Sequence, residues 1–167
     1  MSAARTQQWF AFSTRIKHEK KVNAKIQSAG IESYLPLQKT QNTWKDRKKW
    51  IESPLFPSYI FTKIVFNRRY EVLSIPSVID IVGFNNQPSP VRPDEIEAIK
   101  TLLDIQSQYN VISGLSTGNR VRICSGPLEG FEARVTQVRG NEKLVINISA
   151  IGKSIVINAT DYKIEKI

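Results

Sequence analysis

Hydrophobic positions follow different periods in the two halves of the chain. In the first half, short apolar runs typical of buried strands alternate with segments whose apolar residues recur at helical spacing. Strands are expected over residues 9–13, 32–37, 38–43, 54–65 and 78–84, and helices around residues 22–29, 68–75 and 93–103. This mixed order predicts an α+β fold with a mainly antiparallel sheet and flanking helices.

The first expected helix has two distinct stripes. Val22, Ile26 and Ala29 stand at positions i, i+4 and i+7, which places them on one apolar face. Lys21 and Lys25 share a second, polar stripe. The helix can therefore pack against the domain and present positive charge at the same time.

The segment 54–65, Pro-Leu-Phe-Pro-Ser-Tyr-Ile-Phe-Thr-Lys-Ile-Val, predicts a strand that is apolar on both faces. Successive side chains of a strand point to opposite sides, so Ile60 and Ile64 share one face while Tyr59 and Phe61 share the other. One face must cover the core of a small domain. The other is either covered by a helix or left as a hydrophobic docking surface.

From residue 117 the pattern changes to period two. Glycine-bearing turns such as Gly126-Pro127 and Gly140 separate the alternating segments, which predicts a small, curved β-barrel with residues 161–167 as an added strand. Because these turns interrupt every helical candidate between residues 120 and 157, the barrel is expected to stay β-structured rather than switch to a helical form. The inward positions of the strands would be Val121, Ile123, Phe131, Ala133, Val135, Leu144, Ile146, Ile148, Ile155 and Ile157.

A polar segment without sustained periodicity separates the two patterns. Residues 104–116 are rich in Ser, Asn and Gln, which is typical of a linker. The sequence therefore predicts a first domain over residues 1–103, a linker over 104–116 and a second domain over 117–167.

Charge is concentrated in the first domain. The chain of 167 residues has a net charge of +9, and residues 1–69 hold 14 Lys and Arg against 4 Asp and Glu. Residues 44–50, Trp-Lys-Asp-Arg-Lys-Lys-Trp, look like the basic tip of a hairpin flanked by tryptophans. A basic balance of this kind indicates an anionic partner, of which nucleic acid is the first candidate.

Chemistry-bearing residues are sparse. Cys124 is the only cysteine and His18 the only histidine, so neither a disulfide nor a metal-ligand cluster is expected, and no nucleotide-binding or nucleophile motif occurs. We expect a protein that acts by binding, without a cofactor or metal and not as an enzyme. No secretory signal and no apolar run long enough to cross a membrane is evident, so a cytoplasmic location is expected.

Several of these segments resemble the NusG family of transcription elongation factors. In the first domain the resemblance rests on Trp-Phe-Ala-Phe at residues 9–12, Tyr-Leu-Pro at 34–36 and Pro-Leu-Phe-Pro-Ser-Tyr-Ile-Phe at 54–61. The second domain resembles a KOW domain, an SH3-like barrel, through residues 118–123 and 126–131. The basic hairpin and the short chain are most similar to the specialised RfaH and UpxY type.

The resemblance implies that the first domain docks on the clamp helices of the RNA polymerase β′ subunit and suppresses pausing and termination. Ile81 stands where RfaH-like members carry an aromatic residue. The alternative is that these side chains are ordinary core residues. The residues at the matching positions are Phe12, Phe56, Tyr59, Phe61, Ile81 and Phe84.

The resemblance also places the basic groups around the first helix near upstream DNA or the non-template strand of the elongation complex, and Arg68 and Arg69 toward the polymerase gate or the DNA. The hairpin cations lie between Trp44 and Trp50 and so combine charge with stacking rings, a pairing suited to single strands. The alternative for the helix is a merely solvated face, and the two tryptophans of the hairpin could serve only to pin it. The candidate nucleic-acid contacts are Arg15, Lys17, Lys20, Lys21 and Lys25 around the first helix, Arg47, Lys48 and Lys49 in the hairpin, and Arg68 and Arg69 beyond it.

For the second domain, the resemblance implies recruitment of a small-subunit ribosomal protein or the termination factor Rho. Phe131 and Ile151 are the candidate contacts at the rim of the barrel, although Phe131 has an equal claim to the core. A monomer is expected. The alternative function is a ribosome-associated or RNA-binding KOW protein whose basic first domain binds ribosomal RNA.

Overall fold

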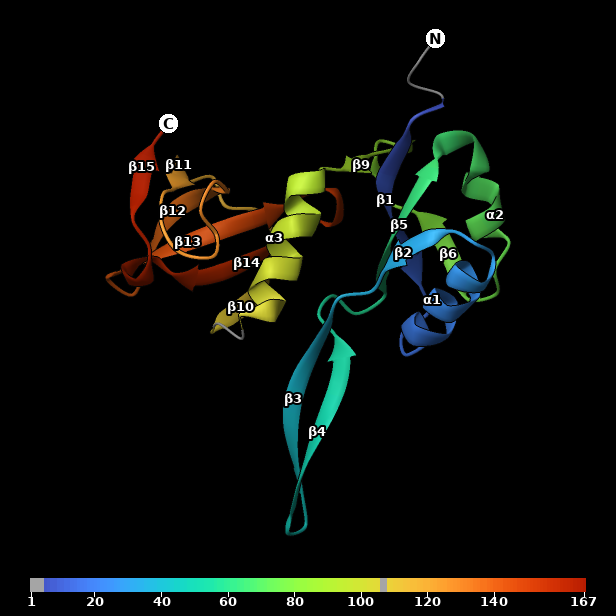
Figure 1. Cartoon of the computed structure of the whole chain (residues 1–167), viewed down its shortest axis with the longest axis horizontal. Helices are drawn as coiled ribbons and strands as arrows, with labels where there is room; N and C mark the ends of the chain where they lie inside the picture. The colour runs from blue at the N-terminus through green and yellow to red at the C-terminus, as the bar shows by residue number, and fades with distance from the viewer. Residues whose placement is uncertain (1–4, 106–107) are drawn as a thin grey trace. The chain divides into compact units, whose positions relative to one another are not determined.

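The computed structural model describes residues 5–105 and 108–167 and divides the chain into two compact units. The first unit extends to Pro90 and the second runs from Val91 to Ile167 (Figure 1).

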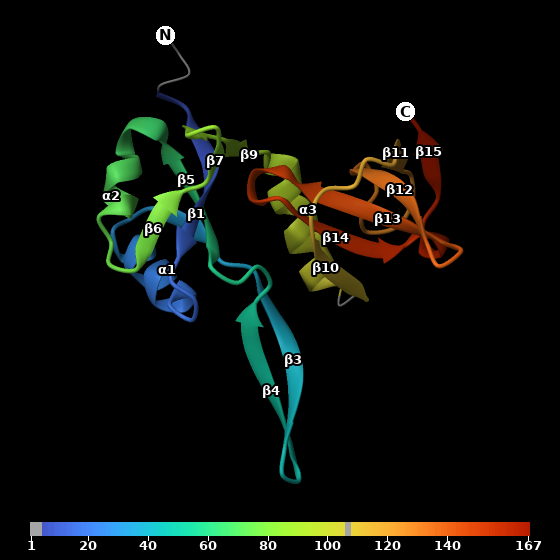
Figure 2. The same ribbon diagram turned by 180° about the vertical axis from the view of Figure 1, so that it is seen from behind.

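An antiparallel sheet forms the centre of the first unit. Its strands follow the order β2-β5-β1-β6, with β1 (Gln7–Thr14) and β5 (Tyr59–Val65) paired in the middle. The shorter strands β2 (Glu32–Tyr34) and β6 (Val78–Ile81) lie on the two sides, and Figure 2 shows β6 next to β1 from behind. The expected α+β fold with a mainly antiparallel sheet is confirmed.

Both helices of this unit pack on the same face of the sheet. Helix α1 (Glu19–Ser28) contributes Val22 and Ile26 to the core, and α2 (Arg69–Leu73), which follows the short helix η2 (Phe66–Arg68), contributes Val72. The sheet side of this core consists of Phe10, Phe12, Ile60 and Ile64. Gly30 follows α1 with φ of 76°, a conformation that a residue without Cβ adopts freely, and so ends the helix.

Two hairpins extend the first unit. The longer hairpin pairs β3 (Leu37–Trp44) with β4 (Arg47–Pro54), and Lys45 and Asp46 form its two-residue turn. The shorter hairpin pairs β7 (Gly83–Phe84) with β8 (Gln87–Pro88). Gly83 is required there, because a Cβ at this position would lie only 1.9 Å from the carbonyl oxygen of Gln87.

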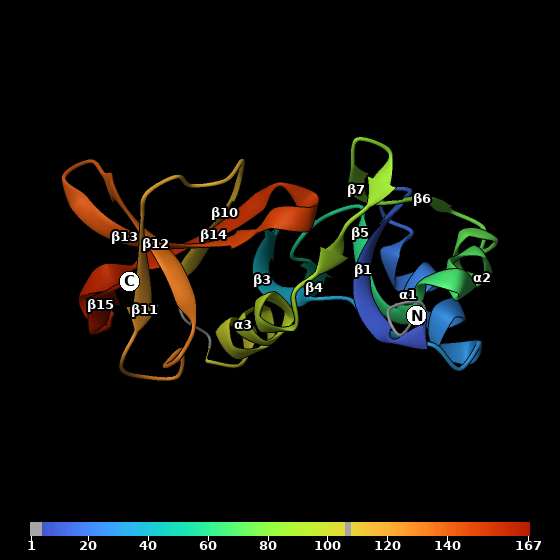
Figure 3. The ribbon, with the colours of Figure 1, turned by 90° about the horizontal axis from the view of Figure 1, so that it is seen from above.

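The second unit combines one helix with a curved antiparallel sheet. Helix α3 (Pro93–Asp104) begins with a proline at its first turn and follows the short strand β9 (Pro90–Val91) at the boundary between the units. The sheet order is β10-β14-β13-β12-β11-β15, and its curvature can be followed in Figure 3. Its strands are β10 (Tyr109–Ser113), β11 (Asn119–Ile123), β12 (Glu132–Val138), β13 (Asn141–Ile148), β14 (Lys153–Asn158) and β15 (Ile164–Lys166), with the short helices η3 (Ser149–Ile151) and η4 (Ala159–Asp161) between them.

Most positions that the alternating pattern predicts to face inward are buried in the barrel core. Val121, Ile123, Leu144 and Ile155 are buried as expected, whereas Phe131 and Val135 are only half-buried. Residues 161–167 contribute strand β15, which pairs with β11. The segments 119–123, 132–138, 141–148 and 153–158 are strands, in agreement with the expected β-barrel.

The expected linker over residues 104–116 is wrong in part, because it contains strand β10. Tyr109 and Val111 are half-buried while Asn110 and Ile112 are exposed, and the strand pairs with β14 from Tyr109 to Ser113. Residues 106 and 107 lie outside the described residues. The segment reads as polar because only one side of this edge strand is covered.

Side-chain hydrogen bonds also fasten the chain after β10 to the barrel. The Asn147 side chain accepts from the Ser116 N–H and donates to the Ser116 carbonyl, both at 3.0 Å. The Ser154 hydroxyl donates to the Gly114 carbonyl at 2.6 Å. Helix α3 also belongs to the second unit. The boundary between the compact units along the chain therefore lies between residues 90 and 91, and not after residue 103.

A buried carboxyl links α3 to the barrel within the second unit. Glu95 is buried, and its Oε1 accepts a hydrogen bond from the Ser149 N–H at 3.4 Å. Burial raises the pKa of Glu95, an effect that the hydrogen bonds only partly oppose. The folded protein therefore holds this proton to a higher pH than the unfolded chain does.

Replacing Glu95 with glutamine is expected to raise the free energy of unfolding near neutral pH. A raised carboxyl pKa means that stability is greatest below the unfolded pKa and falls as pH rises through the folded pKa. Thermal unfolding should be followed across the pH range that includes the unfolded and the folded pKa of Glu95. Above the folded pKa, E95Q should melt at a higher temperature than the unmodified protein, and its melting temperature should depend less on pH. E97Q, at an exposed position of the same helix, should change neither, and equal curves for E95Q and the unmodified protein would contradict the prediction.

Candidate interaction surfaces

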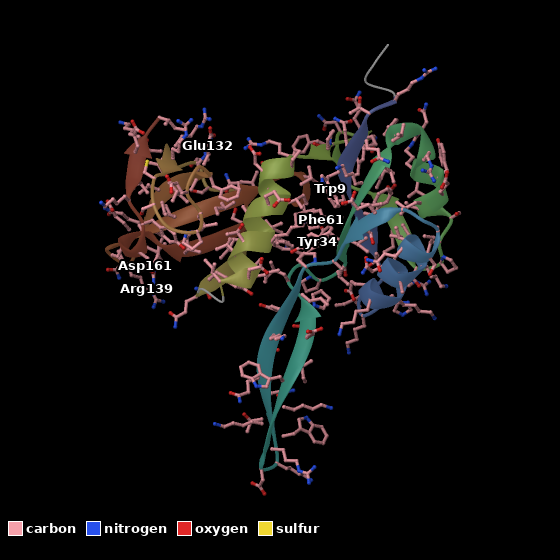
Figure 4. The ribbon with its side chains drawn as sticks, in the orientation of Figure 1. Trp9, Tyr34, Phe61, Glu132, Arg139 and Asp161 are labelled. Atoms are coloured by element: carbon pink, nitrogen blue, oxygen red, sulfur yellow. The ribbon has the colours of Figure 1, made fainter. Side chains whose placement is uncertain are left out.

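The second face of the central sheet lies opposite α1 and α2. Strand pairing places Ala11 opposite Phe61 and Ser13 opposite Tyr59, and Phe61 also lies opposite Tyr34 on β2. Trp9 shares this face with Ala11 by strand alternation. Figure 4 shows Trp9, Tyr34 and Phe61 close together on this side of the sheet. We call this set, with Tyr59, the aromatic face.

Phe56 joins the aromatic face from the turn that precedes β5. Its ring packs edge-to-face against Phe61, with the ring centroids 6.2 Å apart. Both rings are buried, whereas Tyr59 is half-buried and Phe84, in β7, is 79% exposed. The surface members of the expected docking set are therefore Tyr59 and Phe84, while Phe56 and Phe61 form a packed layer and do not lie at the surface.

Phe12 and Ile81 lie on the wrong side of the sheet for the expected docking surface. Phe12 pairs with Ile60 and with Ile81, and all three belong to or pack against the core beneath α1. Phe12 is fully buried there. The resemblance groups these residues with Phe61, but the strand register assigns them to the opposite face of the sheet.

A buried carboxylate fixes the turn that leads into Tyr59. Glu19, in the first turn of α1, is 2% exposed, and its Oε1 accepts the Ser58 N–H at 2.9 Å. The Ser58 carbonyl accepts the Thr14 N–H, also at 2.9 Å. Ser58 has φ of 69°, which is unfavourable for a residue with a Cβ, so both bonds help to hold this conformation. Sequence reasoning missed Glu19, because a lone acidic residue near a helix start is usually solvated.

The basic residues around α1 differ in whether their side chains form hydrogen bonds within the first unit. Lys21 and Lys25 are exposed one turn apart, and Arg15 and Lys17 are exposed in the turn before the helix. The Lys20 ammonium instead donates to the Glu52 carbonyl at 2.8 Å, at the base of the long hairpin. Lys21 and Lys25 therefore present the clearest unengaged positive charge on the helix.

The hairpin cations and tryptophans are all exposed. Trp44 is 74% and Trp50 65% exposed, so neither ring is buried as a structural pin. Arg47, Lys48 and Lys49 are exposed beside them. The structure therefore keeps the predicted nucleic-acid contacts of the hairpin accessible.

Arg68 and Arg69 already have partners within the first unit. Arg68 forms an ion pair with Glu71 at 2.8 Å. The Arg69 guanidinium lies 4.0 Å from the centre of the Phe66 ring and 4.3 Å from that of Tyr70, and it donates to the Tyr70 hydroxyl. Their contact with nucleic acid stays a prediction, and these interactions favour a structural role.

In the second unit, the two candidate contacts differ in exposure. Ile151, in η3, is expected at the surface of the barrel rim. It is only 7% exposed and therefore does not lie at the surface. Phe131 is half-buried and lines a cavity of about 350 Å³. This cavity also contains Arg120 and Glu132, which form an ion pair at 2.7 Å.

Within the described part of the chain, no group of three or more His, Cys, Asp or Glu side chains is arranged to hold a metal ion. Cys124 is exposed and unpaired with another cysteine. No helix among the described residues is both long and apolar enough to span a membrane.

Sequence comparison decides the family to which this architecture belongs. The family model described as "Transcription termination factor nusG" matches residues 7–100. The chain belongs to the NusG family. The match includes all of the first unit from β1 onward and most of α3.

Full-length NusG relatives extend this likeness to the second unit. The chain is 27% identical to a transcription termination/antitermination protein NusG of Campylobacter jejuni, over 97% of this chain and 98% of that one. The same-named protein of Halalkalibacterium halodurans is 22% identical, over 95% and 98%. A solved structure of NusG from Thermotoga maritima, described as showing a domain interaction, is 25% identical over 98% of this chain and 99% of its own, with a TM-score of 0.54. The similarity to the RfaH and UpxY type stays a prediction.

Proposed function

We propose that this NusG-family protein binds RNA polymerase through its aromatic face and opposes pausing and termination of transcription. The observation that carries the proposal is the position of Tyr59 and Phe61 opposite the two helices that cover the other face of β5. A core needs only one apolar face of this strand. On the other face Phe61 is buried and Tyr59 is half-buried, so Tyr59 is the member of the aromatic face that a hydrophobic partner would contact. The helices of the β′ clamp are the proposed partner.

Positive charge around α1 extends the proposed contact to DNA. Lys21 and Lys25 contact phosphates of the upstream duplex or the non-template strand, with Arg15 and Lys17 beside them. Such contacts release counterions and fix the orientation of the protein without reading sequence. The barrel of the second unit then recruits another component, with Phe131 as the proposed contact and a ribosomal protein or Rho as the candidate partner.

Co-purification tests this function directly. The tagged protein is expected to retain RNA polymerase after a high-salt wash, because a hydrophobic interface is little screened by salt. Co-sedimentation with ribosomal subunits in high salt, without retained polymerase, would instead support the ribosome-associated alternative.

The turn held by Glu19 gives a prediction about this site. Replacing Glu19 with alanine leaves the partly buried Ser58 N–H without its acceptor, which should lower the free energy of unfolding by about 1–3 kcal/mol. Because Ser58 immediately precedes Tyr59, polymerase binding should weaken as well. Thermal unfolding and polymerase pull-down measure the two effects.

The matched control is E19Q, which keeps the side-chain volume and an acceptor oxygen. It should retain more stability and more polymerase binding than E19A. If both variants behave like the unmodified protein in both measurements, Glu19 has no positioning role.

A further inference from the structure

The long hairpin of the first unit carries an excess of positive charge. Figures 1 and 2 show β3 and β4 extending away from the sheet of their own unit. Residues 37–54 hold five Lys and Arg against two Asp and Glu. Among the described residues, the cations at the tip form neither ion pairs nor side-chain hydrogen bonds; they are Lys45, Arg47, Lys48 and Lys49.

Strand register divides the hairpin residues between two faces. Trp44 lies opposite Arg47, Asn42 opposite Lys49, and Thr40 opposite Ile51, and directly opposed residues share a face. We call this set of six the tip face. Trp50, opposite Gln41, lies on the other face, so the two tryptophans point in opposite directions.

The tip face is hollowed as well as charged. An open cavity of about 720 Å³ at the end of the hairpin is lined by five of its six members, Asn42, Trp44, Arg47, Lys49 and Ile51, together with the turn residues Lys45 and Asp46 and with Lys48 from the other face. Asp46 is the only acidic residue that lines it. An aromatic ring beside two unneutralised cations suits a ligand with flat rings and repeated negative charges.

Single-stranded nucleic acid has both properties. Aromatic side chains bind unpaired bases by stacking while neighbouring cations follow the phosphates, whereas a duplex hides the faces of its bases. Asn42 adds an amide that makes no hydrogen bond within the described chain. An amide in this position can bond a ribose 2′-hydroxyl, the group that distinguishes RNA from DNA.

We propose that the tip face binds single-stranded RNA, with Trp44 stacked on an unpaired base and Arg47 and Lys49 in contact with the adjacent phosphates. This site adds an RNA contact to the DNA contacts of the proposed function. It does not depend on docking of the aromatic face, because the two surfaces consist of different residues.

Binding of a fluorescently labelled, unstructured RNA of about 12 nucleotides to the full chain tests the proposal by anisotropy at low salt. W44L should weaken binding by about tenfold, because one base loses its stacking platform. W44F retains a ring and should recover most of the affinity, which separates loss of stacking from a disturbed hairpin. W50L removes the same type of ring from the opposite face and should change the affinity less than about twofold.

The proposal would be overturned by unchanged affinity for W44L, by equal losses for W44L and W50L, or by binding of an RNA duplex as tight as that of the single strand. A DNA strand of the same sequence should bind more weakly, and equal affinity for DNA and RNA would overturn the choice of RNA. Polymerase pull-down with the same variants should be unchanged. Failure of the hairpin site and failure of polymerase docking are therefore separate outcomes.

Discussion

Replacing Tyr59 with alanine is expected to weaken binding to RNA polymerase by about 30-fold or more while the protein stays folded. Tyr59 is half-buried, whereas Phe56 and Phe61 are buried and pack against each other, so the truncation removes a partly exposed ring and leaves that buried pair in place. Aromatic anchors at the centre of an interface contribute about 2 kcal/mol or more on truncation, which corresponds to this factor. Pull-down of polymerase with both proteins, accompanied by thermal unfolding, measures the effect.

Tyr70→Ala is the matched control. Tyr70 is a 64% exposed tyrosine on α2, and α2 packs on the face of the sheet opposite Tyr59. Y70A should bind polymerase like the unmodified protein. Unchanged affinity of Y59A, or equal losses in the two variants, would refute the aromatic face as the docking surface.

The alternation of apolar residues was sufficient to predict most of the fold. It assigns Ile60 and Ile64 to one face of β5 and Tyr59 and Phe61 to the other face, and the structure confirms this division. Period two is unambiguous within one strand, because every second side chain must point the same way.

Pairing between strands was not available from the pattern. Phe12 was grouped with Phe61 although the register sets it beside Ile60, because a strand's own alternation does not say which of its faces meets the core. Likewise, the pattern predicts a linker where β10 lies, because the partner of this strand, β14, begins 40 residues after the end of β10. A half-covered edge strand carries a weak apolar signal until that partner is known.

Buried polar contacts were the other class of feature that the sequence did not reveal. Nothing in the sequence connects Glu19 with Ser58, which is 39 residues away, or Lys20 with the carbonyl of Glu52. These contacts exist because α1, β5 and the hairpin meet in the folded unit. The sequence thus predicted the charge and the aromatic residues of the candidate surfaces, but not the groups that position them.

Replacing both Lys21 and Lys25 with glutamate is expected to abolish the low-salt association with upstream DNA or with a paused elongation complex. The two ammonium groups are exposed one turn apart on α1, and their reversal converts attraction of phosphates into repulsion. If each lysine contacts one phosphate, neutralising the two lysines instead of reversing them should lower the slope of log K against log salt by about 0.9 for each, or about 1.8 in all. A salt titration of DNA binding measures this slope, and polymerase docking should survive because the aromatic face is unchanged.

Lys163→Glu with Lys166→Glu provides a control with the same change in net charge. Both lysines are exposed in the second unit, on or next to β15, so this variant tests whether total charge rather than its position on α1 drives the association. The control should retain most of the DNA binding and its salt slope. Crosslinking of DNA to α1 that persists in the Lys21 and Lys25 double variant would show that the stripe is only a solvated surface. Equal losses in the two double variants would assign the attraction to net charge, since a localised contact requires the charges at the place where the phosphates lie.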